Sequence, residues 1–330
     1  MNSNKRVFSG IQPTGEVHLG NYVGAIRNWV DLQSQYESTF CIVDYHAITN
    51  EYQPKKLLQR SLEVAATGIA AGLDPERVTL FIQSSVPEHT ELTWFLTSLT
   101  SVGALERMTQ YKDKCARGQG ALAGLMSYPI LQTADIILYK ANLVPVGEDQ
   151  VQHLELAREI VRRFNNLFGD YFPEPEPLLT SGARVMSLSD PTSKMSKSVE
   201  GSYISLTEEP ESIRRKIKRA VTDPGPQGGE PGPGVANLFT LLEAFAPEDV
   251  TQSFRQDYAN QKLRYSDLKA TLGECIVTTL DPIRTRRAEL LSKPEELKEI
   301  LAAGGDRARE QARDTIRDVR ELMGFQMPVR

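Results

Sequence analysis

The amino-acid sequence predicts an α/β protein, with a doubly wound parallel sheet followed by a helical C-terminal domain. Uninterrupted apolar runs at residues 40–44 and 78–82 are typical of parallel strands that are covered on both faces. Segments with helical spacing stand between such runs, and this alternation favours a parallel sheet. Beyond residue 188 strand signals nearly vanish, and we expect residues 235–330 to be mostly helical.

The expected elements follow one another in a regular order. We expect strands at residues 6–8, 40–44, 78–82 and 143–147, with one more at 185–188. We expect helices at residues 21–30, 54–73, 88–99, 130–139, 148–168 and 210–220. Three prolines mark residues 173–177 as a stiff connector, and glycine and proline dominate residues 223–234.

Composition and charge exclude several classes of protein. The 330 residues are 40% hydrophobic and 25% charged, which suits a soluble protein of about two domains. The net charge of −5 means that any nucleic-acid contact must use local basic patches. The sequence shows neither an apolar run of membrane-spanning length nor a signal peptide. With three scattered cysteines and four histidines, we expect a reduced, cytoplasmic setting and no dedicated transition-metal site.

The stretch at residues 8–21 joins a buried strand to a helix through a turn rich in glycine and proline. The free N–H groups and the positive dipole end of a helix start favour an anionic phosphate. His18 and Asn21 can face the same side of that start, and Gly20 allows a ligand to approach the backbone. The stretch matches neither a Walker loop nor the G-x-G-x-x-G pattern. Taken alone, it indicates either a phosphate site or an ordinary strand-to-helix turn.

A second informative stretch is Lys194-Met195-Ser196-Lys197-Ser198, which lies in a polar loop. Two lysines and two serines at this spacing can hold a chain of phosphates whose charge moves during a reaction. Phosphoryl or nucleotidyl transfer depends on such electrostatic stabilisation more than on a protein nucleophile. The alternative interpretation is a solvated basic loop.

The two stretches together resemble the signatures of a known enzyme family. Residues 13–21 are similar to the HIGH signature of class I aminoacyl-tRNA synthetases, and residues 194–198 are identical to the KMSKS signature. Their order and separation match the small subclass for tryptophan and tyrosine. Further stretches resemble the bacterial tryptophanyl-tRNA synthetases, namely residues 9–13, 41–44, 46–49, 106–110 and 144–150. The resemblance covers nearly the whole chain and implies a Rossmann-like catalytic domain.

The resemblance also implies roles for individual residues in ATP binding and catalysis. It assigns catalytic roles to Gln12, His18, Lys194 and Lys197. It assigns ATP contacts to Gln12, Pro13, Thr14, Gly20, Asn21, Lys114, Gly147, Glu148, Asp149, Val185 and residues Lys194, Met195, Ser196, Lys197 and Ser198. Mg²⁺ is expected on the phosphates, held mainly by them and by water.

A second group of residues is implied to bind tryptophan. It comprises Phe8, His46, Tyr128, Gln132, Asp135, Val144, Val146 and Gln150. Asp135 matches the residue that accepts the indole N–H, and it interrupts an apolar helical run, where a carboxylate without a partner would be costly. His46 follows the second strand, where ligands bind in open sheets, but it could equally be a buried structural histidine. We expect His89 and His153 to be structural or exposed.

Two positions depart from the family pattern. Gln132 stands three residues before Asp135, where most of the family carries Met, and Tyr45 also differs from the usual residue. Both should lie near the amino-acid pocket, so a divergent paralogue with altered recognition of analogues or inhibitors is one interpretation.

The family implies a domain plan, partners and a reaction. We expect a catalytic domain at residues 1–190, with a dimer-interface insertion at about 85–130. Residues 191–330 would carry the KMSKS loop and a helical domain that binds tRNA(Trp) and its anticodon. A homodimer is implied, with no membrane partner. The reaction is activation of L-tryptophan by ATP to the adenylate and pyrophosphate, followed by transfer to the 3′ end of the tRNA.

Two basic clusters are weak candidates for tRNA contact. They comprise Arg214, Arg215, Lys216, Lys218 and Arg219, and Arg284, Arg286 and Arg287. The alternatives left open are a tyrosyl-type synthetase, a small-molecule nucleotidyltransferase, and a non-catalytic RNA-binding or regulatory paralogue.

Overall fold

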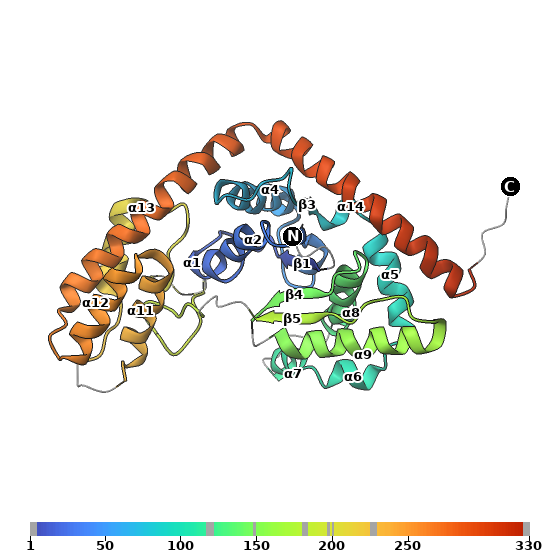
Figure 1. The fold of residues 1–330 in the computed structure, drawn as a ribbon, viewed down its shortest axis with the longest axis horizontal. Coiled ribbons are helices and arrows are strands. Elements are labelled where there is room, and N and C mark those ends of the chain that lie inside the picture. Colours follow the sequence, from blue (N-terminus) through green and yellow to red (C-terminus); the bar gives the residue numbers. More distant parts are fainter. Residues whose placement is uncertain are drawn as a thin grey trace. The chain divides into compact units, whose positions relative to one another are not determined.

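The computed structural model describes residues 5–116, 122–147, 150–179, 184–196, 199, 201–224 and 230–325 (Figure 1). The chain divides into two compact units. Unit 1 comprises Met1–Gly15, Trp29–Thr180 and Lys293–Arg330, and unit 2 comprises Glu16–Asn28 and Ser181–Ser292. None of the helices in the described ranges combines the length and apolar character of a membrane span.

Unit 1 is built on a parallel sheet, as the sequence predicts. In the described residues it has five strands in the order β3-β2-β1-β4-β5. Their bounds are β1 Arg6–Ile11, β2 Glu37–Ile42, β3 Thr79–Ile82, β4 Leu143–Val146 and β5 Glu176–Leu179. The register pairs Phe8 with Thr39 and Thr39 with Thr79. Neighbouring pairs are all parallel, which confirms the doubly wound α/β class.

The helices of unit 1 lie between and beside these strands. They are α2 Arg27–Leu32, which starts in unit 2, α3 Asp44–Ala47, α4 Pro54–Ala70, the 3₁₀ turn η2 Gln83–Ser85, α5 Glu88–Thr97, α6 Val102–Glu106, α7 Thr109–Ala116, α8 Ala123–Ile137, α9 Val151–Phe168 and α14 Pro294–Leu322. Pro54 begins α4 at a position where its missing N–H costs nothing. A continuous core of buried side chains joins α5, α8 and α9 to the sheet, with Phe81, Ile130 and Phe164 completely buried.

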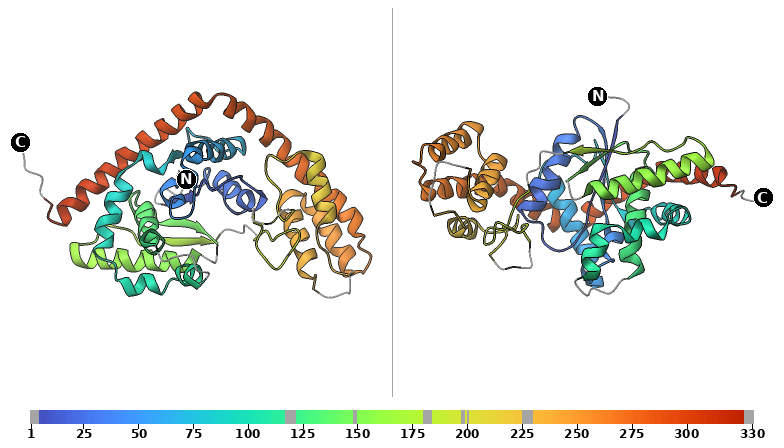
Figure 2. Two further views of the ribbon diagram at one scale, coloured as in Figure 1. Left: turned by 180° about the vertical axis from the view of Figure 1, so that it is seen from behind. Right: turned by 90° about the horizontal axis from the view of Figure 1, so that it is seen from below.

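The C-terminal helix α14 packs against β3 and α5, as Figures 1 and 2 both show. Gly304 permits this close approach, because a Cβ there would lie 1.8 Å from the carbonyl oxygen of Leu80. Arg307 donates to the carbonyl oxygens of Pro75 and Val78, at 2.8 and 3.1 Å. These contacts make α14 part of unit 1 although it follows unit 2 in the sequence.

Two predictions about strands are wrong. Residues 176–179 form β5, although the prolines around them suggest a connector. As the last strand in the sheet order, β5 tolerates Pro177 because one of its edges has no ladder to donate to. Residues 185–188 form no sheet strand in the described chain, and Met186 makes only an isolated antiparallel bridge with Lys194.

Unit 2 is mainly helical. Its elements are α1 Leu19–Asn21, the π-helical segment η1 Tyr22–Ile26, α10 Pro210–Arg219, α11 Pro233–Phe245, α12 Glu248–Ala259 and α13 Tyr265–Ser292. The segment that contains His18 belongs here because it bridges to Ser205, and because Leu19 donates to the carbonyl oxygen of Ile204 at 3.0 Å. The observed units therefore do not coincide with the expected boundary at residues 190 and 191. Residues 16–28 and 181–190 join the helical unit, and α14 joins the sheet.

Candidate active site

The strand order creates a switch point beside β1. β1 has β2 on one side and β4 on the other, so successive connections leave it in opposite directions. In open α/β sheets, ligands bind beyond the carboxyl ends of the strands at this point. Gln12, Pro13 and Thr14 follow β1 directly, and Gly147 follows β4. Four of the predicted ATP residues therefore lie at the switch point of unit 1.

Asp135 is the centre of a buried hydrogen-bond network in the same unit. Its Oδ1 lies 2.7 Å from Nε2 of Gln83 and 2.7 Å from Nδ1 of His89. Its Oδ2 lies 2.7 Å from Nε2 of His46, and Nε2 of His89 lies 2.8 Å from the hydroxyl of Tyr139. All five residues are at most 5% exposed. We refer to Asp135, His46, Gln83, His89 and Tyr139 as the Asp135 network.

The charge of Asp135 follows from these partners. Burial by itself would raise the pKa of the carboxyl group. The charge and hydrogen bond of His46, together with the hydrogen bond from His89, outweigh burial and lower the pKa of Asp135 from 3.8 to about 2. The group is therefore an ionised carboxylate at neutral pH, and it can only accept hydrogen bonds.

The network leaves Asp135 with acceptor capacity in a defined place. A carboxylate offers about four acceptor positions. Donors from the described residues take two on Oδ1 and one on Oδ2. One acceptor position on Oδ2 is not taken by a described residue.

Gln83 is held so that its amide can donate to Asp135. The backbone N–H of Tyr45 donates to Oε1 of Gln83 at 3.1 Å, which turns Nε2 toward Asp135. The neighbouring N–H of Ser84 donates to Oδ1 of Asp44 at 2.9 Å. The loops after β2 and β3 are thus tied together beneath the carboxylate. Tyr45, one of the departures from the family pattern, contributes its backbone here.

The sequence by itself indicates no site role for His89, Gln83 or Tyr139. Of the two alternatives expected for His89, structural or exposed, the structure has it buried, with hydrogen-bond contacts to Asp135 and Tyr139. Gln83 follows β3 as His46 follows β2, so the same rule about strand ends could have selected it. His89 and Tyr139 carry no comparable signal in the sequence.

Tyr128 belongs to a second hydrogen-bonded group, in which His153 is buried and Tyr128 and Gln110 are half-buried. Its hydroxyl donates to Oε1 of Gln110 at 2.9 Å and lies 2.6 Å from Nε2 of His153. Burial raises the pKa of the Tyr128 hydroxyl to about 12, so it stays protonated. The ring also meets the His46 ring edge-on, at 6.3 Å between centroids. His153, which sequence reasoning left aside, is thus the partner that fixes Tyr128.

The remaining predicted tryptophan residues lie nearby in unit 1. Phe8 on β1 stacks on Tyr139 with centroids 5.8 Å apart, and Val144 and Val146 are buried on β4. Gln132 is half-buried on α8 and makes no hydrogen bond to another described residue. Gln150 precedes α9, where its N–H donates to the carbonyl oxygen of Gly147 at 3.0 Å.

The predicted phosphate residues of the helix start lie in unit 2. The N–H of His18 donates to Oδ1 of Asn21 at 3.2 Å, so both residues are fixed at the first turn. A Cβ on Gly20 would lie 2.9 Å from Cε1 of His18, which explains why glycine is needed beneath the imidazole. The helix continues as the π-helical segment η1, a form often found at functional sites.

The start of the loop at residues 194–198, the signature loop, contacts residues 185 and 186 in unit 2, and the turn that precedes it is held by Asp190. Met195 donates to the carbonyl oxygen of Val185 at 3.2 Å, and Met186 bridges to Lys194. Asp190 accepts bonds from the side chains of Thr192 and Ser193, and these bonds lower its pKa. Of the predicted residues in this region, Val185 and Met195 are buried, Ser196 is half-buried and Lys194 is exposed.

Several predicted residues lie outside the described part of the structure. They are Glu148, Asp149, Lys197 and Ser198, together with the side chain of Lys114. Within the described residues, no group of three or more His, Cys, Asp or Glu side chains is placed to hold a metal ion.

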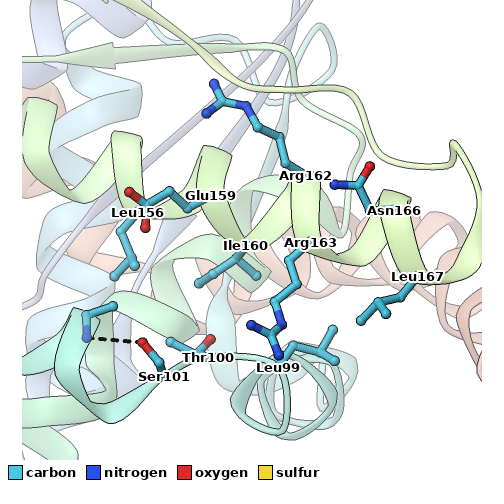
Figure 3. Close-up of a pocket in the computed structure, with 11 residues that line it drawn as sticks. Leu99, Thr100, Ser101, Leu156, Glu159, Ile160, Arg162, Arg163, Asn166 and Leu167 are labelled. Carbon is cyan, nitrogen blue, oxygen red and sulfur yellow. Dashed lines mark hydrogen bonds between the residues drawn. The ribbon is translucent and has the colours of Figure 1, made fainter.

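A cavity of about 460 Å³ lies elsewhere in unit 1, between the α5–α6 region and α9 (Figure 3). Its lining residues are Leu99, Thr100, Ser101, Ala104, Leu156, Glu159, Ile160, Arg162, Arg163, Asn166 and Leu167. None of these belongs to the Asp135 network or to the predicted ATP residues. The cavity is therefore distinct from the candidate active site.

Comparison with known proteins gives a consistent result. The family described as "tRNA synthetases class I (W and Y)" matches residues 1–281. The chain is 45% identical to the tryptophan–tRNA ligase of Clostridium tetani over 98% of this chain and 97% of that protein. It is 46% identical to the tryptophan–tRNA ligase of Helicobacter pylori over 97% of this chain and 99% of that protein.

The fold of this chain is also similar to that of solved synthetase structures. The tryptophanyl-tRNA synthetase of Campylobacter jejuni, complexed with ADP and tryptophan, matches with a TM-score of 0.83 at 36% identity, over 97% of this chain and 99% of that chain. The Mycoplasma pneumoniae tryptophanyl-tRNA synthetase gives a TM-score of 0.87 at 35% identity, over 98% of both chains. A tyrosyl-tRNA synthetase of Aeropyrum pernix, at 22% identity and a TM-score of 0.69 over 91% of this chain and 90% of that chain, shares the fold.

Proposed function

Since this chain belongs to the class I tRNA synthetases for tryptophan and tyrosine, we propose that it activates L-tryptophan with ATP and transfers it to tRNA(Trp). The observation that carries the choice of amino acid is the buried, ionised Asp135 with one acceptor position left on Oδ2. An indole N–H is an uncharged donor on an apolar ring, which suits a buried carboxylate that can only accept. A tyrosyl substrate would instead bring a hydroxyl, which donates one hydrogen bond and can also accept.

The first step needs alignment and charge stabilisation rather than a base. The carboxylate of tryptophan is already ionised at neutral pH, so it can attack the α-phosphorus of ATP and release pyrophosphate. Lys194 and Lys197 of the signature loop would stabilise the negative charge that moves onto the leaving phosphates. His18 and Asn21, fixed at the helix start, would contact the same phosphates.

Residues at the strand ends would bind the other parts of ATP. We assign Gln12, Pro13, Thr14 and Gly147 to this role because they follow β1 and β4 at the switch point. Mg²⁺, held mainly by the phosphates and by water, would neutralise charge on the phosphates. We make the same assignment for Lys114, Glu148, Asp149 and Ser198 from the family resemblance alone.

Transfer to tRNA requires exposed cations that can contact its phosphates. The ion pairs on α10 reduce the number of basic residues that are candidates for this role. Arg214 makes a bidentate contact with Glu274, and Lys216 pairs with Glu208 at 2.7 Å. These two cations are engaged within unit 2. On the same helix, α10, the exposed cations Arg215, Lys218 and Arg219 make no ion pair with another described residue. We propose these three as the phosphate contacts of α10.

We propose that the protein is a cytoplasmic homodimer whose interface includes residues of about 85–130. Three large apolar side chains of this segment are exposed: Trp94 at 71%, Val102 at 60% and Leu122 at 67%. Burying such side chains between two copies would remove apolar surface from water.

The deciding experiment is amino-acid-dependent ATP–pyrophosphate exchange with the purified chain. We expect exchange with L-tryptophan and at least about 10²-fold lower kcat/KM with L-tyrosine. Preference for tyrosine would identify a tyrosyl-type enzyme. Absence of exchange with both amino acids would point to a non-catalytic paralogue. Aminoacylation of a tRNA(Trp) transcript then tests the second step.

A further inference from the structure

The chain Tyr139–His89–Asp135 fixes where the protons of His89 lie. The Asp135 carboxylate can only accept, so the 2.7 Å contact requires a proton on Nδ1 of His89. In a neutral imidazole, Nε2 is then an acceptor, and the Tyr139 hydroxyl at 2.8 Å is the donor that it needs. Tyr139 thus selects the tautomer of His89 that points a proton at Asp135.

The surroundings preserve this arrangement. Burial raises the pKa of the Tyr139 hydroxyl well above its usual value, and nearby negative charge acts in the same direction, so the hydroxyl keeps its proton. The His89 ring stands among aromatic rings, with centroid distances of 5.9 Å to Phe81 and 5.5 Å to Tyr139. Water and alternative partners are excluded because His89 is 0% exposed.

Helix α14 makes contacts with both of the segments that carry His89 and Tyr139. Glu88, next to His89, pairs with Arg309 at 3.0 Å. Gln311 donates to the carbonyl oxygen of Tyr139 at 3.0 Å. The first turn of α5 and the end of the α8 segment are therefore tied to the same helix, which limits relative movement of the two rings.

We propose that His89 and Tyr139 are positioning residues for amino-acid selection: Tyr139 sets the His89 tautomer, and His89 holds Oδ1 of Asp135 so that Oδ2 meets the N–H of the substrate ring. This inference rests on the proposed function, because it takes tryptophan as the substrate. Neither residue touches the ligand in this scheme. Their effect passes through the orientation of one carboxylate.

Two substitutions of His89 separate positioning from mere packing. His89→Asn places an amide nitrogen where Nδ1 stands, so it can still donate to Asp135, although it loses Tyr139. His89→Gln places its amide near the position of Nε2, so it keeps the Tyr139 contact and loses the donor to Asp135. We expect His89→Gln to raise the KM for tryptophan roughly 10–100-fold. We expect His89→Asn to stay within about fivefold of the wild type, with the KM for ATP unchanged in both variants.

Tyr139→Phe provides a test that keeps the packing of the ring. Without the hydroxyl, the Nδ1–H tautomer loses its support, so we expect the KM for tryptophan to rise about tenfold. A tryptophan analogue with sulfur in place of the ring N–H serves as the probe for the Oδ2 position. Tyr139→Phe and His89→Gln should lower the ratio of kcat/KM for tryptophan to that for the analogue.

The outcomes distinguish this inference from the proposed function. If the wild type exchanges with tryptophan but His89→Asn and His89→Gln behave alike, the positioning role is wrong and the proposed function stands. The same holds if Tyr139→Phe changes tryptophan and the analogue by one factor. If the wild type does not activate tryptophan, both the function and the inference fail. Should the His89 variants not fold, Tyr139→Phe alone decides.

Discussion

The side-chain amide of Asn237 makes two hydrogen bonds with the backbone of Met186. Its Oδ1 accepts from the Met186 N–H and its Nδ2 donates to the Met186 carbonyl oxygen, each at 2.9 Å. Met186 in turn bridges to Lys194, the first residue of the signature loop. Asn237 lies on α11 and is 4% exposed. Its two hydrogen bonds therefore hold the Met186 backbone, and through it the start of the signature loop, in place within unit 2.

Replacement of Asn237 should therefore impair the loop without touching the ligand. We expect Asn237→Ala to slow adenylate formation about tenfold and to raise the KM for ATP, because two backbone groups lose their partner. The KM for tryptophan should stay unchanged. Asn237→Asp, which can accept but not donate, should have an intermediate effect. Asn260 is exposed in the same unit, and Asn260→Ala is the control. Equal kinetics in all variants would show that Asn237 does not support the loop.

The lysines of the signature loop should act on chemistry rather than on folding. We expect Lys194→Ala and Lys197→Ala each to slow adenylate formation by about 10²–10³, equivalent to roughly 2.7–4 kcal/mol, because each removes a cation from the moving phosphate charge. Single-turnover adenylate formation is the measurement, with thermal unfolding as the control for fold. Unchanged rates in both variants would remove this loop from the mechanism.

The sheet could be predicted from the sequence because central parallel strands must be apolar on both faces. The run from Phe40 to Val43 is almost completely buried, which is the state that its composition predicts. β5 could not be predicted in this way. Its prolines are typical of a connector, and only its place at the sheet edge makes them acceptable.

The candidate site could be predicted only in part, for a similar reason. Asp135 is conspicuous because a charged residue interrupts an apolar helix. Its partners Gln83 and His89 come from segments 52 and 46 residues away, and no local pattern connects them. Tertiary structure alone brings these groups together, so their role could not be read from spacing.

The network should make stability depend on pH through Asp135. The carboxyl has a pKa of about 2 in the folded state against an ordinary value of 3.8, so it stabilises the fold above about pH 4 and this contribution is lost as the pH falls toward 2. This pKa shift corresponds to a contribution of about 2 kcal/mol to the free energy of unfolding. Urea unfolding of the wild type and Asp135→Asn at several pH values between 2 and 5 is the measurement. We expect the stability difference to shrink as the pH falls, whereas a constant difference would show that Asp135 does not carry this charge.

Gly304 should be intolerant of any side chain. A Cβ there would lie 1.8 Å from the carbonyl oxygen and 2.8 Å from the carbonyl carbon of Leu80, and backbone atoms cannot move aside as a flexible side chain can. We expect Gly304→Ala to lower the free energy of unfolding by about 3 kcal/mol or to detach α14. Gly124→Ala is the matched control on a helix of the same unit, because the nearest atom to its added Cβ is 3.9 Å away. Gly124→Ala should raise the free energy of unfolding by about 0.5–1 kcal/mol. A similar loss of stability in both variants would contradict the packing argument.

Gln132 offers a test of how the amino-acid pocket differs from that of the family. It lies three residues before Asp135 on α8, so the two side chains emerge on the same side of the helix. Its amide is half-buried and makes no hydrogen bond within the described residues, so it is available to water or to a polar atom of a ligand. A methionine would present a flexible apolar wall instead.

We therefore expect Gln132→Met to change discrimination among indole-like ligands more than turnover of tryptophan. An amide that faces an apolar ring loses hydration without gaining a partner, whereas a ring with a polar substituent can supply one. The measurement is ATP–pyrophosphate exchange with tryptophan, ring-substituted tryptophans and an inhibitor that mimics tryptophan with a polar head. Gln132→Met should change kcat/KM for polar-substituted rings about tenfold relative to tryptophan, the effect of roughly one hydrogen bond. If every ligand shifts by the same factor, Gln132 affects only general packing, and its amide has no part in recognising the ring.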